Sequence, residues 1–161
     1  MKNFAKFAAA IFLASGVIAA SSPAIAQGRA IDLKGYVKLE KIITGNDGAT
    51  SVELVEPETI VPGDKLIFGT DYSNNSAEAV SNFVVTNPIP SAVRLAPVAS
   101  SDLTVSVDGG ANWGKLATLS VEQGDGTKRP AQHADVTHVR WTLAAVAPGE
   151  KGRLEYPAII R

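Results

Sequence analysis

The chain has 161 residues, a formal net charge of −1 at pH 7 and no cysteine. A charge so close to zero excludes the strongly basic surface that is typical of nucleic-acid-binding proteins. The lack of cysteine excludes disulfides, thiolate metal sites and membrane attachment through a lipid-modified cysteine.

The first 26 residues have the pattern of a secretory signal peptide. Lys2 and Lys6 give the start a positive charge, residues 7–20 are apolar, and residues 24–26 read Ala-Ile-Ala, a cleavage signal before Gln27. The apolar run is too short to span a bilayer comfortably, although a retained N-terminal anchor is the alternative. The sequence therefore predicts export to the periplasm or the cell exterior, with no membrane-spanning segment after cleavage.

The first strands after the leader are predicted to lie at a sheet edge. Residues 27–35 show no regular pattern, whereas apolar side chains alternate through residues 36–43 and predict a strand. Lys41 lies on the more apolar side of that strand, which favours an edge position because a charge there discourages unwanted pairing. A turn at residues 45–48 (Gly-Asn-Asp-Gly) and a short strand at residues 52–55 follow.

The next part of the chain predicts two strands on either side of a polar turn. Pro62 and Gly63 predict a tight turn, because proline fixes φ at the first central position and glycine supplies a positive φ at the second. Apolar residues then alternate with polar ones, as in a strand with one buried face. These apolar residues are Leu66, Phe68 and Tyr72. A break at residues 74–76 precedes a second strand that begins near Phe83 and ends in Asn-Pro-Ile-Pro.

The rest of the chain predicts short strands separated by turns. The expected strands are residues 93–95, 103–107, 116–121, 139–143 and 154–160. Residues 123–135 are the longest polar stretch and form either a long hairpin loop or an exposed excursion. Alternate residues of the strand at 139–143 share one face, with Trp141 as the expected core residue. A second Pro-Gly turn, at residues 148–149, repeats the chemistry of the first.

These features predict an all-β fold, a single β-sandwich of about eight or nine strands. The strand spacing and the lack of a convincing helical pattern after the leader favour it, and a small β-barrel is the alternative. The predicted organisation is a signal peptide at residues 1–26, a lead-in with the first edge strands at residues 27–60, and the main domain at residues 61–161. This length suits one domain without covalent cross-links.

Several short motifs resemble those of a known family. They are Val-Pro-Gly-Asp-x-Leu at residues 61–66, Tyr-x-Asn at 72–74, Val-Val-x-Asn-Pro-x-Pro at 84–90, Val-Asp-Gly-Gly at 107–110, Val-Arg-Trp-Thr-Leu at 139–143 and Ala-Pro-Gly-Glu at 147–150. Together they resemble the conserved repeat domain of bacterial and archaeal surface proteins, a family largely of unknown function. The resemblance covers residues 61–161 and implies an immunoglobulin-like β-sandwich. The chain departs from the family in two ways. Asn87 occupies a position where the family often has Asp, and this chain has one copy of the domain whereas the family commonly has tandem arrays.

No group of residues predicts catalysis. The sequence has no Gly-x-Ser-x-Gly elbow and no Gly-rich loop that leads into a helix. His133, Asp135 and His138 have the side chains of a zinc site, but within one strand His138 would face away from Asp135, so solvent-exposed histidines are the preferred interpretation. Several aspartates fall at turns, which they favour without any ion, and none lies in a calcium-loop motif. We therefore predict no enzyme activity, no cofactor and no bound metal.

Two features are candidates for contacts with a partner. Trp113 follows a Gly-Gly turn and is expected either to be partly exposed and to anchor a partner, or to pack over a neighbouring loop, which is the commoner arrangement. A strand-exchange segment is also possible, which would leave its own sheet and pair with an exposed edge of the next subunit. Its residues are Tyr36, Val37, Leu39 and Ile43.

The sequence thus predicts an exported, non-enzymatic structural or adhesive protein of the cell envelope. Its expected partners are other envelope proteins or copies of itself, and not nucleic acid. The alternative is a soluble periplasmic binding module or assembly chaperone, although immunoglobulin-like chaperones generally use two such domains and this chain has room for one. Because a fold does not dictate a function, the site has to carry the argument.

Overall fold

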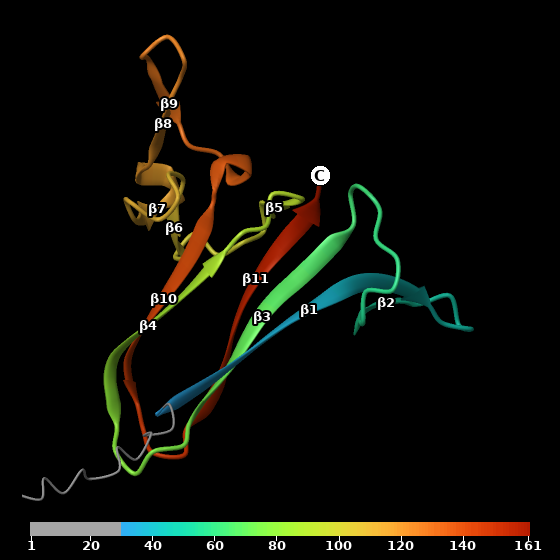
Figure 1. Ribbon diagram of the computed structural model, residues 1–161. Helices are drawn as coiled ribbons and strands as arrows, with labels where there is room; N and C mark the ends of the chain where they lie inside the picture. The colour runs from blue at the N-terminus through green and yellow to red at the C-terminus, as the bar shows by residue number, and fades with distance from the viewer. Residues whose placement is uncertain (1–29) are drawn as a thin grey trace, which may run out of the picture.

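The computed structural model describes residues 30–161, so the predicted leader at residues 1–26 lies outside the described residues. Residues 30–161 form eleven strands and two short 3₁₀ helices, and their two main sheets face each other as layers (Figure 1). The predicted all-β, sandwich-like fold is confirmed. Within the same range, no helix has the length and the apolar character needed to cross a membrane.

The first sheet has five strands in the order β2-β1-β3-β11-β5. They are β1 (Ile31–Thr44), β2 (Thr50–Val55), β3 (Lys65–Asn74), β5 (Val93–Leu95) and β11 (Lys151–Ile160). The expectation that residues 27–35 lack regular structure is wrong for residues 31–35, because β1 begins at Ile31. The backbone of these residues pairs antiparallel with β3, and that pairing overrides the weak local pattern around Gly35.

The second sheet has four strands in the order β4-β10-β6-β7. They are β4 (Val80–Pro88), β6 (Thr104–Ser106), β7 (Gly114–Lys115) and β10 (His138–Val146). β4 is the outer strand, and Asn82 interrupts its regular backbone with a φ of 51°. This left-handed conformation is one that asparagine tolerates better than most residues.

Between β7 and β10 the chain forms a small projecting unit. It contains η1 (Leu116–Thr118), β8 (Ser120–Glu122), β9 (Lys128–Pro130) and η2 (His133–Asp135). The strand expected at residues 116–121 is wrong in its first half, because the N–H of Leu119 donates to the carbonyl oxygen of Leu116 and closes a 3₁₀ turn. The polar stretch at residues 123–135 contains the turn that follows β8, then β9, which pairs with β8, and then η2. The short strands β7 and β9 account for the difference between the eleven strands observed and the eight or nine expected.

The core lies between the two sheets and is built from alternate residues of the strands. Its buried members include Leu66, Leu95, Val105, Val139 and Tyr156. Phe68 stacks on Tyr156 with ring centroids 5.3 Å apart, and Trp141 approaches the same ring at 6.3 Å. Trp141 packs against the core as expected but is only partly buried, since β6 pairs with β10 no further than Arg140.

Two turns of the same construction begin the neighbouring strands β3 and β11. Gly63 and Gly149 follow a proline and have positive φ values of 96° and 74°. Asp64 and Glu150 then accept a hydrogen bond from the backbone N–H three residues earlier, at 2.8 Å and 2.7 Å. The two predicted Pro-Gly turns are confirmed, and the acidic residue after each glycine closes the turn a second time.

One end of the sandwich is closed by Asn74, the last residue of β3. Its side chain has no exposed surface and donates to the carbonyl oxygens of Glu78 at 2.8 Å and Val146 at 2.9 Å. Its side-chain oxygen accepts from both the N–H and the hydroxyl of Ser76. Asn74 therefore ties the loop that leads to β4 to the end of β10, and so joins the two sheets.

Candidate functional site

A β-hairpin projects from the edge of the first sheet. β1 pairs with β3 along residues 31–39 and with β2 along residues 39–44, so the end of β1 extends past β3. Figure 1 shows β2 and the end of β1 reaching away from the two layers. The expected turn at residues 45–48 joins the two strands. We call residues 40–55 the projecting hairpin.

One face of the projecting hairpin is apolar and exposed. Ile42 lies directly opposite Val52, and Leu54 comes two residues later on the same face. The exposed fractions are 74% for Ile42, 62% for Val52 and 50% for Leu54. The preceding β1 residues on this face, Lys38 and Glu40, are polar, as is usual for side chains that point to solvent. Ile42, Val52 and Leu54 together form what we call the hairpin face, a contiguous apolar surface of the kind that marks contact sites.

The chain around the hairpin face is acidic. Between residues 38 and 60 it has five acidic residues and two lysines. Lys38 forms an ion pair with Glu56, which leaves Lys41 as the other cation of this region. The projecting hairpin thus presents aliphatic side chains within a negatively charged surround.

Tyr36, from the predicted strand-exchange segment, lies within the sheet and holds β1 to its neighbours. Its ring covers Gly69 of β3 so closely that a Cβ atom at position 69 would overlap the ring. Its hydroxyl donates a hydrogen bond to the carboxylate of Glu155 on β11. Burial, and then the Glu155 carboxylate, raise the pKa of Tyr36 above its usual value.

The other residues of that segment lie in two different settings. Val37 and Leu39 pack against the core, whereas Ile43 lies on the projecting hairpin. The segment is therefore fixed in the sheet over its first half and projects from it over its second half. Strand exchange stays a prediction, and it would require the contact between Tyr36 and Gly69 to break.

A cleft opens between the two sheets at the end of the sandwich away from Asn74. Its volume is about 750 Å³, within the range of sites that bind small molecules or side chains. The loop after β5 forms one wall, β6 with η1 forms another, and η2 with the residues before it forms the third. Its apolar lining includes Leu95, Ala99, Leu103, Val105, Leu116 and Ala131.

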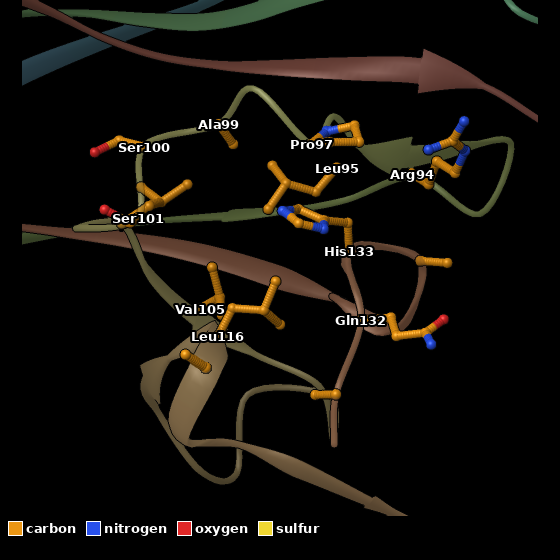
Figure 2. A pocket seen from close by; sticks show the side chains of 14 residues that line it. Arg94, Leu95, Pro97, Ala99, Ser100, Ser101, Val105, Leu116, Gln132 and His133 are labelled. Carbon is orange, nitrogen blue, oxygen red and sulfur yellow. The ribbon is translucent and has the colours of Figure 1, made fainter. Parts of the chain in front are cut away.

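Figure 2 shows how the side chains of the cleft lie. Leu95 projects from the first sheet toward Val105 and Leu116, which face it from the other side. Arg94 lies at one end of the cleft, and Ser100 lies at the opposite end. The cleft is therefore a mainly aliphatic trough, with polar groups at its two ends and the imidazole of His133 beside Leu95 in its middle.

Two structural features account for the open space. β5 and β6 have three residues each, so each covers only a short stretch beside the longer strands β11 and β10. The guanidinium of Arg161 donates to the carbonyl oxygens of Val93 at 2.8 Å and Ala134 at 2.7 Å, which holds η2 beside β5. The walls are thus braced by hydrogen bonds rather than by side chains filling the cleft.

The acidic residues closest to the cleft are already paired with cations. Asp102 accepts from Lys115 at 2.7 Å, and Asp135 forms a two-bond pair with Arg129 at 2.6 Å and 2.7 Å. These hydrogen bonds hold the pKa values of both aspartates below their usual range. Arg94 has no ion-pair partner among residues 30–161. The cleft therefore carries an uncompensated positive charge at one end.

Trp113 lies on the outer face of the second sheet and away from the cleft. Its Nε1 donates to the carbonyl oxygen of Gly110 at 2.8 Å, and the guanidinium of Arg140 lies 3.5 Å from the centre of one ring face. His138 approaches the ring edge-on. Trp113 is partly buried, which agrees with packing over a neighbouring loop, and a partner contact through its ring stays a prediction.

Of the residues considered for a metal site, Asp135 and His138 are engaged in other contacts and His133 lines the cleft; both histidines are partly buried rather than fully exposed as expected. Asp135 accepts hydrogen bonds from Arg129 and from the N–H of Gln132, and His138 lies beside Trp113 and Thr137. Within residues 30–161, no three histidine or carboxylate side chains gather in a way that could hold an ion.

No family model matches the chain, and searches of curated proteins and of solved structures found no significant match. The resemblance to the surface-protein repeat and the immunoglobulin-like topology therefore stay predictions. The hairpin face was not predicted from the sequence. The available signal was the alternation of Val52 and Leu54 with polar residues, which gives that short strand one apolar face. The cleft was not predicted either, because its lining comes from segments far apart in the chain and carries no local signal.

Proposed function

We propose that this protein is an exported, non-enzymatic component of the cell envelope that acts through protein–protein contacts, with the hairpin face as its main contact surface. One observation carries the proposal. Ile42, Val52 and Leu54 are exposed side by side on a paired, two-stranded support that extends beyond the sandwich. Burial of such a surface against a partner is favourable in proportion to the apolar area removed from water.

Two further features support this proposal. The leader pattern at residues 1–26 favours export, which would place the hairpin face where envelope partners are present. Tyr36 over Gly69, three residues before β1 leaves β3, gives the projecting hairpin a rigid base, which lowers the entropy lost on binding.

The test compares cross-linking of the full chain, produced with its leader, in intact cells that carry the wild type or one of two variants. The hairpin variant Ile42→Thr/Val52→Thr keeps β-branched residues and removes apolar surface. Val84→Thr is the matched control, because Val84 is also exposed but lies on β4 of the other sheet.

We expect the wild type and the control to give the same cross-linked species and the hairpin variant to lose them. A hairpin variant that keeps every cross-linked species of the wild type would contradict the proposal. Circular dichroism and thermal melting of the three purified proteins show whether the loss reflects a lost contact rather than a lost fold.

The cleft favours a second function, that of a soluble periplasmic binding module or assembly chaperone. Its supporting observation is the aliphatic trough with Arg94 at one end, which suits an apolar group next to a negative charge. This function predicts a client that binds in the cleft of a protein that stays monomeric.

A further inference from the structure

We infer that the occupant of the cleft is the hairpin face of a second copy of this chain, so that copies join head to tail. This inference rests on the proposed function, because it assigns a partner to the same hairpin face. The shapes and the side-chain chemistry agree. The projecting hairpin carries three adjacent aliphatic residues on one face of its two strands, and the cleft is a concave space with a mainly apolar lining.

The charges of the two surfaces are complementary. The chain around the hairpin face has an excess of acidic residues, and Glu40 lies on the same face as Ile42. The cleft presents Arg94 without an acidic partner among the described residues, while Asp102 and Asp135 beside it are already paired with cations. Opposite charges around an apolar contact steer the two surfaces together and fix their orientation.

The same charges disfavour the simplest alternative, a symmetric dimer in which two hairpin faces meet. In such a contact the same patch is used by both copies, so the carboxylates around the hairpin would approach their own equivalents. Like charges brought together at an interface cost binding free energy and suppress that pairing. The cleft offers the hairpin face a surface without this conflict.

The strand order places the two surfaces on different sides of one copy. In the first sheet, β2 is at one edge and β5 is at the other, with β1, β3 and β11 between them. The projecting hairpin extends from the β2 edge, and the cleft lies beside β5. A copy whose cleft is filled still has a free hairpin face, so copies can add one after another, and the rotation between copies decides whether the series closes into a ring.

The test uses one variant for each surface, made in the full chain that is produced with its leader and recovered from the exported fraction. The hairpin variant is again Ile42→Thr/Val52→Thr. The cleft variant is Ala117→Trp, in which the indole fills the space from an exposed position on η1. Arg94→Glu is a second cleft variant that changes the charge and leaves the lining intact. Sedimentation velocity over a range of concentrations measures the size of the species.

The wild type is expected to form a concentration-dependent series of oligomers, and each variant alone to associate more weakly by about tenfold or more. An equimolar mixture of the hairpin variant and Ala117→Trp is expected to form pairs and nothing larger. The intact hairpin face of Ala117→Trp binds the intact cleft of the hairpin variant, and the pair then has no intact surface left for a third copy. Such pairs would support the head-to-tail contact directly.

Three outcomes would overturn the inference. They are a wild type that stays monomeric, cleft variants that associate as the wild type does, and a mixture that forms no pairs. If the cleft variants associate normally while the hairpin variant does not, the proposed function stands and only the assignment of the cleft fails. If the hairpin variant keeps both its oligomers and its cross-linked species, the proposed function fails as well.

Discussion

The two ends of the sandwich are built in opposite ways. At the closed end, Asn74 of β3 is fully buried, and its side chain bonds backbone carbonyls of the loop before β4 and of β10 in the other sheet. At the open end, β5 and β6 stop after three residues each, and the space between the sheets is the cleft. The comparison indicates that the fold places its most demanding polar contacts at one end, which leaves the other end free to expose apolar surface at little cost to stability.

The closed end gives the largest expected effect. Asn74→Ala should lower the free energy of unfolding by about 3 kcal/mol or more, because it leaves buried carbonyl oxygens without donors. Chemical denaturation measures the change. Asn75→Ala is the matched control: its exposed side chain bonds only Asp32 and Ser73, so its loss should cost less than about 1 kcal/mol. Equal effects at the two positions would remove the distinction between the closed end and an ordinary loop.

The middle of the sandwich gives a smaller effect that depends on pH. Burial raises the pKa of Tyr156 to about 12, above its ordinary value of 10.0. A folded-state pKa above the unfolded one means that the stabilising contribution is complete below pH 10 and is lost as the pH rises from about 10 to 12. Unfolding experiments at a series of alkaline pH values should show a decline in this window, and Tyr156→Phe should make it shallower. An unchanged slope in Tyr156→Phe would show that this hydroxyl is not the group responsible.

The open end gives the smallest expected effect. Leu116 lines the cleft and is only partly buried, so Leu116→Ala should cost about 1 kcal/mol or less. The same substitution at Leu66, which is buried in the core, should cost about 2–4 kcal/mol. Thermal melting of the two variants checks the difference. A large loss at Leu116 would mean that the cleft wall is part of the stabilising core.

The sequence was a good guide where local chemistry decides the backbone. The Pro-Gly turns at residues 62–63 and 148–149 and the alternation at residues 139–143 were predictable, because turn geometry and strand parity depend on nearby residues. The first half of β1 was not predictable, because its pairing with β3 comes from residues more than thirty positions away. The 3₁₀ turn at residues 116–118 likewise replaces an expected strand, since short apolar runs do not distinguish the two.

The candidate site was less predictable than the fold. Tyr36, Val37, Leu39 and Ile43 were singled out as one segment, yet three of them hold the sheet together and only Ile43 lies on the projecting hairpin. The hairpin face becomes visible only when the register pairs Ile42 with Val52 beyond the end of β3. The end of β3 relative to β1 depends on pairing across the whole sheet, so no single stretch of sequence predicts it.

The interruption of β4 at Asn82 bears on how selectively this protein associates. An exposed outer strand offers a row of unpaired backbone groups, and a second molecule can add to it and begin uncontrolled aggregation. The left-handed φ at Asn82 breaks that row near the start of the strand. Fibril-like stacking along this edge is thereby discouraged. At the β4 edge, contacts with a partner are thus left to side chains, which discriminate between partners better than unpaired backbone groups do.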